Sequence, residues 1–454
     1  MVRNAYAERM SKESASSARK PSTVRHTRAI QADRSKHPPA APPAAEVERW
    51  LTEIVYPATF AQLAHYRELG LRERILTLPV TVALVLSLLW RQVSGVCELV
   101  RLLGSEGLLW VSEPVPVSQQ AVSDRLRTLP AALFQCILAD VLVQMAERWQ
   151  ARNRPLPPEI AWAQERYSQV LVHDGSTLDA LVRKVGLLRD AETHPLAGRM
   201  TALMSLVTRL PCQVWYEADA QAHDQRFWPR ILAALPAGAL LLFDLGYTNF
   251  GRFAQLTAAQ VTFVTRAKSN LAYQLERSIV RSAQVHDQLI WIGQGEDRQL
   301  VRLVAVLKQG KWYRYLTNEL DADRLPAAYV LALYHQRWRI EDAYAIVKRL
   351  LGLAYFWTGA ENGIQLQLWA TWLLYALLVD LTDAVAQALN QPFAAISLEM
   401  VYRSLYYFGQ AAHRDNATDV VGYLVANAKL LGIRKRTFTR TYLVKLNLTS
   451  GSSP

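Results

Sequence analysis

Two aspartates stand where short apolar segments end. Asp174 follows the segment 169–173 in the stretch HDGSTL, and Asp244 follows Leu240–Phe243 in the stretch FDLGY. Continuous apolar runs are typical of buried strands, and α/β sheets present reactive groups at the carboxyl ends of their strands. A glycine follows each acid closely and permits a sharp departure of the chain. The pattern predicts two carboxylates at a sheet edge, with aspartates that merely cap a turn as the alternative.

A third acid lies on a segment with helical periodicity. Four of its polar residues are spaced i, i+3, i+7 and i+14, and at about 100° per residue they fall within an arc of roughly 60°. A separate apolar stripe at sevenfold spacing is available to anchor the helix. An acid, two cations and a phenol on one face suit a site for metal and phosphate, whereas charge pairs on a solvated face are the alternative. The four residues are Tyr334, Arg337, Glu341 and Lys348.

The spacing Y-(2)-R-(3)-E-(6)-K resembles the signature of the IS4 family of bacterial insertion-sequence transposases, which this sequence matches without a gap. That family places its first catalytic aspartate in a DGT/S strand end and its second in a D-x-G-Y/F strand end, and Asp174 and Asp244 match both. The motifs cover about residues 170–350. Residues 46–165 and 350–445 are similar to the family only in architecture.

The resemblance implies a catalytic role for three acids. Asp174, Asp244 and Glu341 are expected to bind two Mg²⁺ ions, for which Mn²⁺ could substitute, because hard oxygen ligands suit these cations. One ion would activate water or a DNA 3′-OH, and the other would stabilise the departing 3′-oxygen. No small-molecule cofactor is implied. His173 precedes Asp174, but side chains alternate along a strand, so we do not expect it to be a ligand.

The resemblance also implies contacts with DNA. Arg337 and Lys348 are expected to hold phosphates of the transposon end, and Tyr334 to hydrogen-bond one. Some relatives release their element through a DNA hairpin, with a tryptophan some twenty residues before the motif tyrosine stacked on a flipped base. Trp312 lies 22 residues before Tyr334. Base stacking and burial in a strand core are the two interpretations of Trp312.

The charge balance indicates a polyanionic partner. The chain of 454 residues has 51 Lys and Arg against 39 Asp and Glu, a net charge of +12. Residues 1–45 contribute half of this excess and would raise the affinity for any DNA. Arg266 and Lys268 follow a core strand and are expected to contact phosphate. Five cations near the C-terminus form either a DNA contact or a solvated face: Arg434, Lys435, Arg436, Arg440 and Lys445.

The elements that must position these residues predict an α/β fold. Apolar segments at 168–173, 200–210, 213–218, 239–243 and 261–266 are expected strands, with a helix at 223–235. Further strands are expected at 288–292, 299–307 and 312–317. Helices at 94–103 and 118–127 resemble a helix-turn-helix, with an ordinary helical hairpin as the alternative.

Composition divides the chain into five parts, of which the resemblance implies that the third is an RNase H-like mixed-sheet core. The parts are a disordered basic arm at 1–45, a helical DNA-binding domain at 46–152, the catalytic core at 160–266 plus 327–360, a β-rich insertion at 267–326, and a C-terminal helical region at 361–454 for DNA contact or dimerisation. Three widely spaced cysteines argue against a disulfide framework and favour a reduced cytoplasm. Apolar runs at 75–90 and 366–379 are shorter than the roughly 20 residues of a membrane span.

These observations and the resemblance predict a DNA transposase that binds terminal inverted repeats, cuts the ends and joins them to target DNA. Its expected location is the bacterial cytoplasm, in association with the nucleoid. The expected partners are double-stranded DNA and a second copy of the chain on paired ends, with no membrane. Three alternatives remain: a domesticated or non-mobilising DNA-binding relative, a sequence-specific regulator built on the helical region, and a structure-directed nuclease with an RNase H fold.

Overall fold

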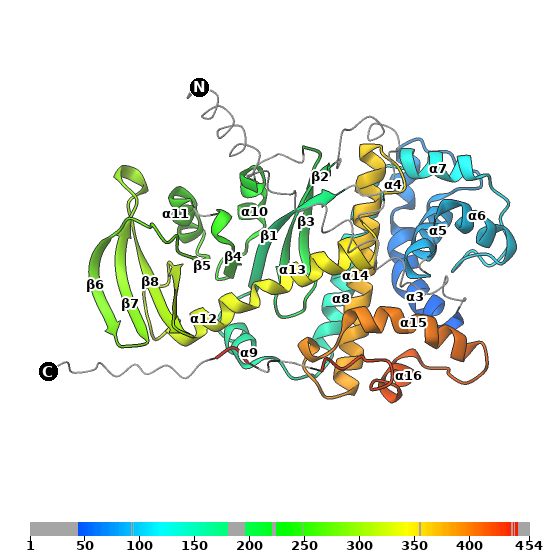
Figure 1. Ribbon diagram of the computed structural model, residues 1–454. Coiled ribbons are helices and arrows are strands. Elements are labelled where there is room, and N and C mark those ends of the chain that lie inside the picture. Colours follow the sequence, from blue (N-terminus) through cyan, green and yellow to red (C-terminus); the bar gives the residue numbers. More distant parts are fainter. Residues whose placement is uncertain are drawn as a thin grey trace, which may run out of the picture.

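The computed structural model describes residues 44–443, except for 92, 94, 180–195, 220–223, 248, 354–355, 437–438 and 440. The prediction of a disordered arm at 1–45 therefore concerns residues that lie almost entirely outside the described part, as do Arg440 and Lys445. Figure 1 shows a broad sheet on one side and a group of helices on the other, with the long helix α14 standing between them.

The N-terminal region is helical, as predicted. The apolar run near residue 80 forms α5, which is buried on almost all sides and is therefore a core helix. The side chain of Ser118 accepts a hydrogen bond from the amide of Ala121 and caps α7, as its sequence position predicted. The helices are α3 (Ala45–Ala61), α4 (Leu63–Glu68), α5 (Leu78–Trp90), α6 (Val96–Ser105), α7 (Gln119–Thr128), α8 (Ala131–Gln150) and α9 (Pro158–Gln164).

The expected helix-turn-helix does not form between α6 and α7. Residues 106–118 separate the two helices and include a β-bridge between Leu108 and Val111. A helix-turn-helix joins its helices by a turn of about 3–4 residues. Both helices form close to their predicted bounds, and the helix-turn-helix interpretation was wrong because the connection between them is too long for the short turn of that motif.

A single sheet of nine strands carries the second half of the fold. Its strands lie in the order β3-β2-β1-β4-β5-β9-β8-β7-β6. β1, β4 and β5 pair in parallel, and all other neighbours pair antiparallel, so the sheet is mixed. This confirms the mixed α/β fold. The strands are β1 (Val170–Asp179), β2 (Leu196–Ser205), β3 (Pro211–Glu217), β4 (Leu240–Phe243), β5 (Thr262–Arg266), β6 (Gln274–Arg281), β7 (Val285–Ile292), β8 (Gln299–Lys308) and β9 (Lys311–Thr317).

The strands of the β-rich segment continue the core sheet. β9 pairs with β5 from Val264 opposite Thr317 to Arg266 opposite Tyr315, so backbone hydrogen bonds join the segment to the core. β6 was not predicted from the sequence. It is a largely exposed edge strand of mostly polar residues, and its pairing with β7 supplies the order that its composition does not indicate.

Helices cover both faces of the sheet. α10 (Trp228–Ala234) and α11 (Phe250–Ala258) pack on one face, where their apolar residues meet alternate residues of β1, β4 and β5. On the other face lie α12 (Ala327–Gln336), α13 (Trp338–Ala345) and α14 (Glu361–Ala388), with α8 behind them. This alternation places neighbouring residues of each strand in different cores.

The segment that contains the polar face is not one regular helix. α12 ends at Gln336, α13 begins at Trp338, and a π-helical turn at Ile346–Leu350 follows. Arg337 between the two helices keeps helical angles, with φ −53° and ψ −36°, so the chain direction is nearly preserved. The prediction of one continuous helix is thus corrected, since a π-helical turn changes the angle between successive residues and moves Lys348 relative to the others.

α14 is the central helix of the C-terminal region and packs against α8, α15 (Leu398–Ala412) and α16 (Val420–Ala426). By length and composition it could cross a membrane, as could the bent pair of α7 and α8 among the described residues. However, 94% of its most apolar window is buried inside the protein, which is the burial of a core helix. The three cysteines are free thiols.

Candidate active site

Asp174 and Asp244 lie side by side because their strands are parallel neighbours. The parallel register of β1 and β4 ends with His173 opposite Phe243, and each aspartate is the next residue of its chain. Asp174 was expected at the end of β1, but it lies in the middle of that strand. The strand runs on to Asp179 because β2 continues to pair with it, and Gly175 is therefore a strand residue rather than a turn. The carboxyl edge is instead the point where β4 ends.

α13 brings the third acid to this edge through a tyrosine. Tyr344 donates its hydroxyl proton to the backbone oxygen of Asp174 at 2.6 Å and accepts the amide proton of Ala202 at 3.0 Å. One buried phenol thereby ties α13 to both β1 and β2. Glu341 lies almost one helical turn before it and faces the two aspartates. The sequence could have indicated Tyr344, because it follows Arg337 by seven residues and so shares its face of the helix.

Arg337 lies among the three carboxylates. Its Nη1 contacts Oδ2 of Asp174 at 3.0 Å, and its Nη2 contacts Oε1 of Glu341 at 3.0 Å and Oδ1 of Asp244 at 3.9 Å. Only 4% of Arg337 is exposed. Arg337 was expected to hold a phosphate of the transposon end, and its ion pairs with the three acids were not predicted. A guanidinium suits carboxylate and phosphate equally, and only the position of the aspartates determines which one it meets here.

The three acids differ in their access to solvent. The side chain of Asp174 is 17% exposed, whereas Asp244 and Glu341 are 45% and 39% exposed. Burial raises the pKa of Asp174 to about 6; Arg337 opposes this shift, and the two other carboxylates add to it. Burial alone would lower the pKa of Arg337, but Tyr334 and the acids raise it. The site therefore favours a cation at its centre and a partly protonated Asp174.

Tyr334 and Lys348 fasten the site from its two sides. The Tyr334 hydroxyl donates to Oδ1 of Asp244 at 3.3 Å, and burial raises its pKa, so the phenol remains a donor. Its ring packs 5.0 Å from that of Tyr315 on β9. Lys348 donates to the backbone oxygen of Thr177 at 2.8 Å and to the hydroxyl of Ser176 at 3.3 Å. The Tyr334, Arg337, Glu341 and Lys348 side chains thus converge on the ends of β1 and β4.

Three further candidate residues have no ion pair with the carboxylates among the described residues. Trp312 on β9 is 38% exposed and stacks on His286 with ring centroids 4.4 Å apart, so it is not a strand-core residue. Arg266 is the exposed last residue of β5, level with Asp244 in the parallel register of β4 and β5, and it lies over the ring of Tyr313. Lys268 is exposed two residues after β5. His173 is buried on the opposite side of β1 and hydrogen-bonds Thr201.

The three carboxylates that surround Arg337 offer the oxygen ligands that a hard divalent cation prefers. In the described part of the chain, however, no three or more acidic, histidine or cysteine side chains are arranged so that they could hold a metal ion. Arg337 lies between them instead, and its Nε is buried without a hydrogen-bond partner. For these acids to hold a metal ion, their side chains would have to change position and the guanidinium of Arg337 would have to move aside or stay paired with only some of them.

Residues 190–377 match the family model of the transposase DDE domain. The match covers less than half of the chain. It includes Asp244 and Glu341 but begins after Asp174, so the transposase DDE domain match covers two of the three acids.

Two curated proteins are similar to the chain. It is 30% identical over 171 residues to the putative transposase y4zB of Sinorhizobium fredii, covering 35% of this chain and 47% of that protein. It is 25% identical over 210 residues to the probable transposase for insertion sequence element IS5377 of Geobacillus stearothermophilus, covering 44% of this chain and 54% of that protein. The chain spans about half the length of the curated relatives it matches.

Proposed function

We propose that the protein is a DNA transposase of a bacterial insertion sequence, of the IS4 family, with an RNase H-like catalytic core. The observation that carries the proposal is the convergence of Asp174, Asp244 and Glu341 around Arg337, in a chain that contains a transposase DDE domain match. The spacing of the four residues on α12 and α13 and at the following π-helical turn supports the family. Similarity to two named transposases supports the activity.

The three acids would hold two Mg²⁺ ions, or Mn²⁺ in their place. Bound there, the ions would stabilise both the attacking and the leaving oxygen of an in-line displacement at phosphorus. The chain's own residues prepare the site. Arg337 offsets the mutual repulsion of the carboxylates, Tyr344 fixes the distance between α13 and β1, and the low exposure of Asp174 limits competing water.

The substrate would be the double-stranded DNA of the element's ends, and then target DNA. The residues proposed to contact it are Tyr334, Arg337, Lys348, Trp312, Arg266 and Lys268. Support comes from their place around the carboxyl edge of β1 and β4 or on the exposed side of β5 and β9. A homodimer on paired ends, in the bacterial cytoplasm and associated with the nucleoid, completes the proposal.

The decisive experiment is strand transfer of end-containing DNA in Mg²⁺. Glu341→Gln should abolish cleavage and joining, while Glu361→Gln, at the exposed start of α14, should act as the wild type does. Cleavage that survives Glu341→Gln would contradict the metal-site assignment. Cleavage without joining by the wild type would favour the nuclease alternative, and binding without cleavage the non-mobilising relative. Short inverted repeats should also flank the coding sequence.

A further inference from the structure

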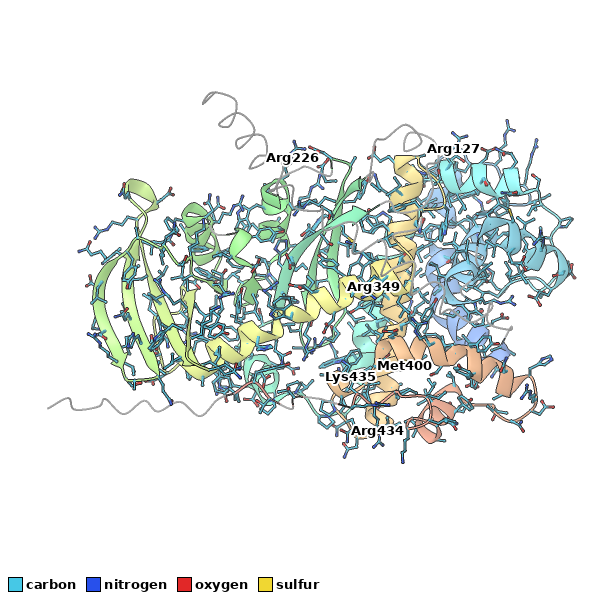
Figure 2. The ribbon with its side chains drawn as sticks, in the orientation of Figure 1. Arg127, Arg226, Arg349, Met400, Arg434 and Lys435 are labelled. Carbon is cyan, nitrogen blue, oxygen red and sulfur yellow. The ribbon has the colours of Figure 1, made fainter. Side chains whose placement is uncertain are left out.

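A second group of cations lies on the rear of α13, away from the carboxylates. An open cavity of about 360 Å³ is lined there by α13, the turn between β2 and β3, α14 and the start of α15. Arg209 reaches it from the turn, Arg339 from α13, and Lys435 from the segment after α16. Figure 2 labels Lys435 close to Met400 at the start of α15, where this segment crosses the helices. Three positive side chains therefore share one hollow.

Arg209 is the deepest of the three. It is 7% exposed, and within the described part of the chain its guanidinium has neither an ion pair nor a hydrogen bond, although its backbone oxygen accepts the Tyr375 hydroxyl at 3.2 Å. Burial and then repulsion from Arg339 lower its pKa to about 9. A buried charge without a partner is unfavourable, and proteins normally pair such groups. The described residues supply no such partner for Arg209.

The acids of the cavity do not neutralise this charge. Asp342 is 64% exposed and pairs with Arg339 at 3.1 Å, while Glu399 is 50% exposed and pairs with Arg403 at 2.9 Å. Loss of solvent and repulsion from Arg339 lower the pKa of Lys435, which Asp342 only partly offsets. The amino end of α15, a helix of 15 residues capped by Ser397, adds partial positive charge. The interior of the cavity thus remains positive.

We propose that this cavity binds a phosphate group, with Arg209 inside and Arg339 and Lys435 around the entrance. Guanidinium groups bind phosphate oxygens through paired hydrogen bonds, and an ammonium adds a mobile donor. The volume exceeds that of one phosphate, so the group belongs either to a free phosphate ion with water or to a nucleic-acid backbone. This site is distinct from the carboxylates and does not depend on the proposed transposase activity.

Calorimetric titration of the full chain with inorganic phosphate, at constant ionic strength against chloride, tests the proposal. We expect saturable binding that Lys435→Ala weakens about tenfold, the worth of one charge-assisted hydrogen bond. Arg209→Asn should weaken it further, and asparagine tolerates the φ of +66° at this position. Lys429→Ala, an exposed lysine six residues before Lys435, should bind phosphate as the wild type does. If Arg209→Asn does not fold, the surface pair Lys435→Ala and Lys429→Ala is sufficient.

Binding of a short DNA duplex at fixed salt distinguishes the two sources of phosphate. If Lys435→Ala binds DNA more weakly than Lys429→Ala and inorganic phosphate competes, the occupant is a backbone phosphate. If the DNA affinity of the two variants is the same while phosphate still binds at Arg209, the occupant is a free ion. The proposal is overturned if neither phosphate nor DNA binding distinguishes Lys435→Ala and Arg209→Asn from Lys429→Ala. None of these measurements requires cleavage or joining.

Discussion

The front and the rear of α13 each bury one arginine, but they treat its charge in opposite ways. Arg337 is 4% exposed and Arg209 is 7% exposed, so loss of solvent is similar. Arg337 has three carboxylates within 4 Å, and its pKa is raised. Arg209 has Arg339 as its strongest charged neighbour, and its pKa is lowered. The neighbouring charges, and not the extent of burial, therefore determine whether the pKa of a buried arginine is raised or lowered.

The largest expected effect comes from removing each arginine in turn. Arg337→Gln leaves three carboxylates without their cation and should lower the free energy of unfolding by about 3 kcal/mol. Arg209→Asn removes an unpaired charge and should lower it little or even raise it. Urea denaturation with a chelator and without phosphate measures both. Equal losses for the two variants would contradict the contrast between front and rear.

The next effect concerns two tyrosines that tie helices to the sheet, Tyr344 on α13 and Tyr375 on α14. Tyr344→Phe removes a hydroxyl that bonds both Asp174 and Ala202 and should cost about 2 kcal/mol of unfolding free energy. Tyr375→Phe removes a main-chain bond to Arg209 and a weak, long contact with the sulfur of Met204, and should cost about 1 kcal/mol. Both are read from urea denaturation at one pH. A larger loss for Tyr375→Phe would show that the bond from α14, and not the one from α13, is the stronger tie between a helix and the sheet.

A pH dependence should mark the front face. The folded-state pKa of Asp174 is about 6, above its ordinary value of 3.8, so the folded protein holds more protons between these limits. Its contribution to stability is therefore complete below pH 3.8 and is lost as the pH rises through 6. Because Asp174 keeps some solvent contact, we expect a loss of roughly 1–2 kcal/mol. Without metal, the free energy of unfolding of Asp174→Asn should lack this dependence on pH. The same dependence in the variant would show that another group causes it.

The smallest expected effect is that of Tyr334→Phe. Its bond to Asp244 is 3.3 Å long and its acceptor is 45% exposed, so water replaces the phenol readily. We expect a loss of about 0.5 kcal/mol in unfolding free energy. Thermal or urea denaturation beside Tyr344→Phe gives the comparison. A loss as large as that of Tyr344→Phe would mean that Tyr334 is a main support of the site.

Local patterns predicted much of the front face. The apolar runs before Asp174 and Asp244 gave two strands, and the periodicity of 334–348 gave a polar face with Glu341 on it. The local patterns failed where pairing with a strand elsewhere in the sequence determines the structure. β1 extends past Asp174 because β2 pairs there, and β6 exists because β7 orders it. The helical break at Arg337 and the following π-helical turn likewise had no signal in the spacing.

The rear face had almost no sequence signal. Arg209 follows β2, Arg339 lies on α13, and Lys435 follows α16, so more than a hundred residues separate the first from the second. Lys435 was noted only as one of five cations near the C-terminus, as a DNA contact or a solvated face. The ion pairs of Arg337 were missed for a related reason, since guanidinium groups suit phosphate and carboxylate alike. Partners so remote in sequence become neighbours only through the packing of α13 and α14.

The pairing of β9 with β5 has a mechanical consequence. Any motion of the β-rich segment against the core must break backbone hydrogen bonds between Val264–Arg266 and their partners on β9. Among the described residues, no hydrogen bond joins the backbone of α14 to the backbone of the sheet, and the contacts run through side chains, for example where the Tyr375 hydroxyl donates to the backbone oxygen of Arg209. Side-chain packing can slide by small steps, whereas a strand register cannot. We therefore expect the nine strands to move as one rigid unit, and any relative motion to occur between the sheet and α14.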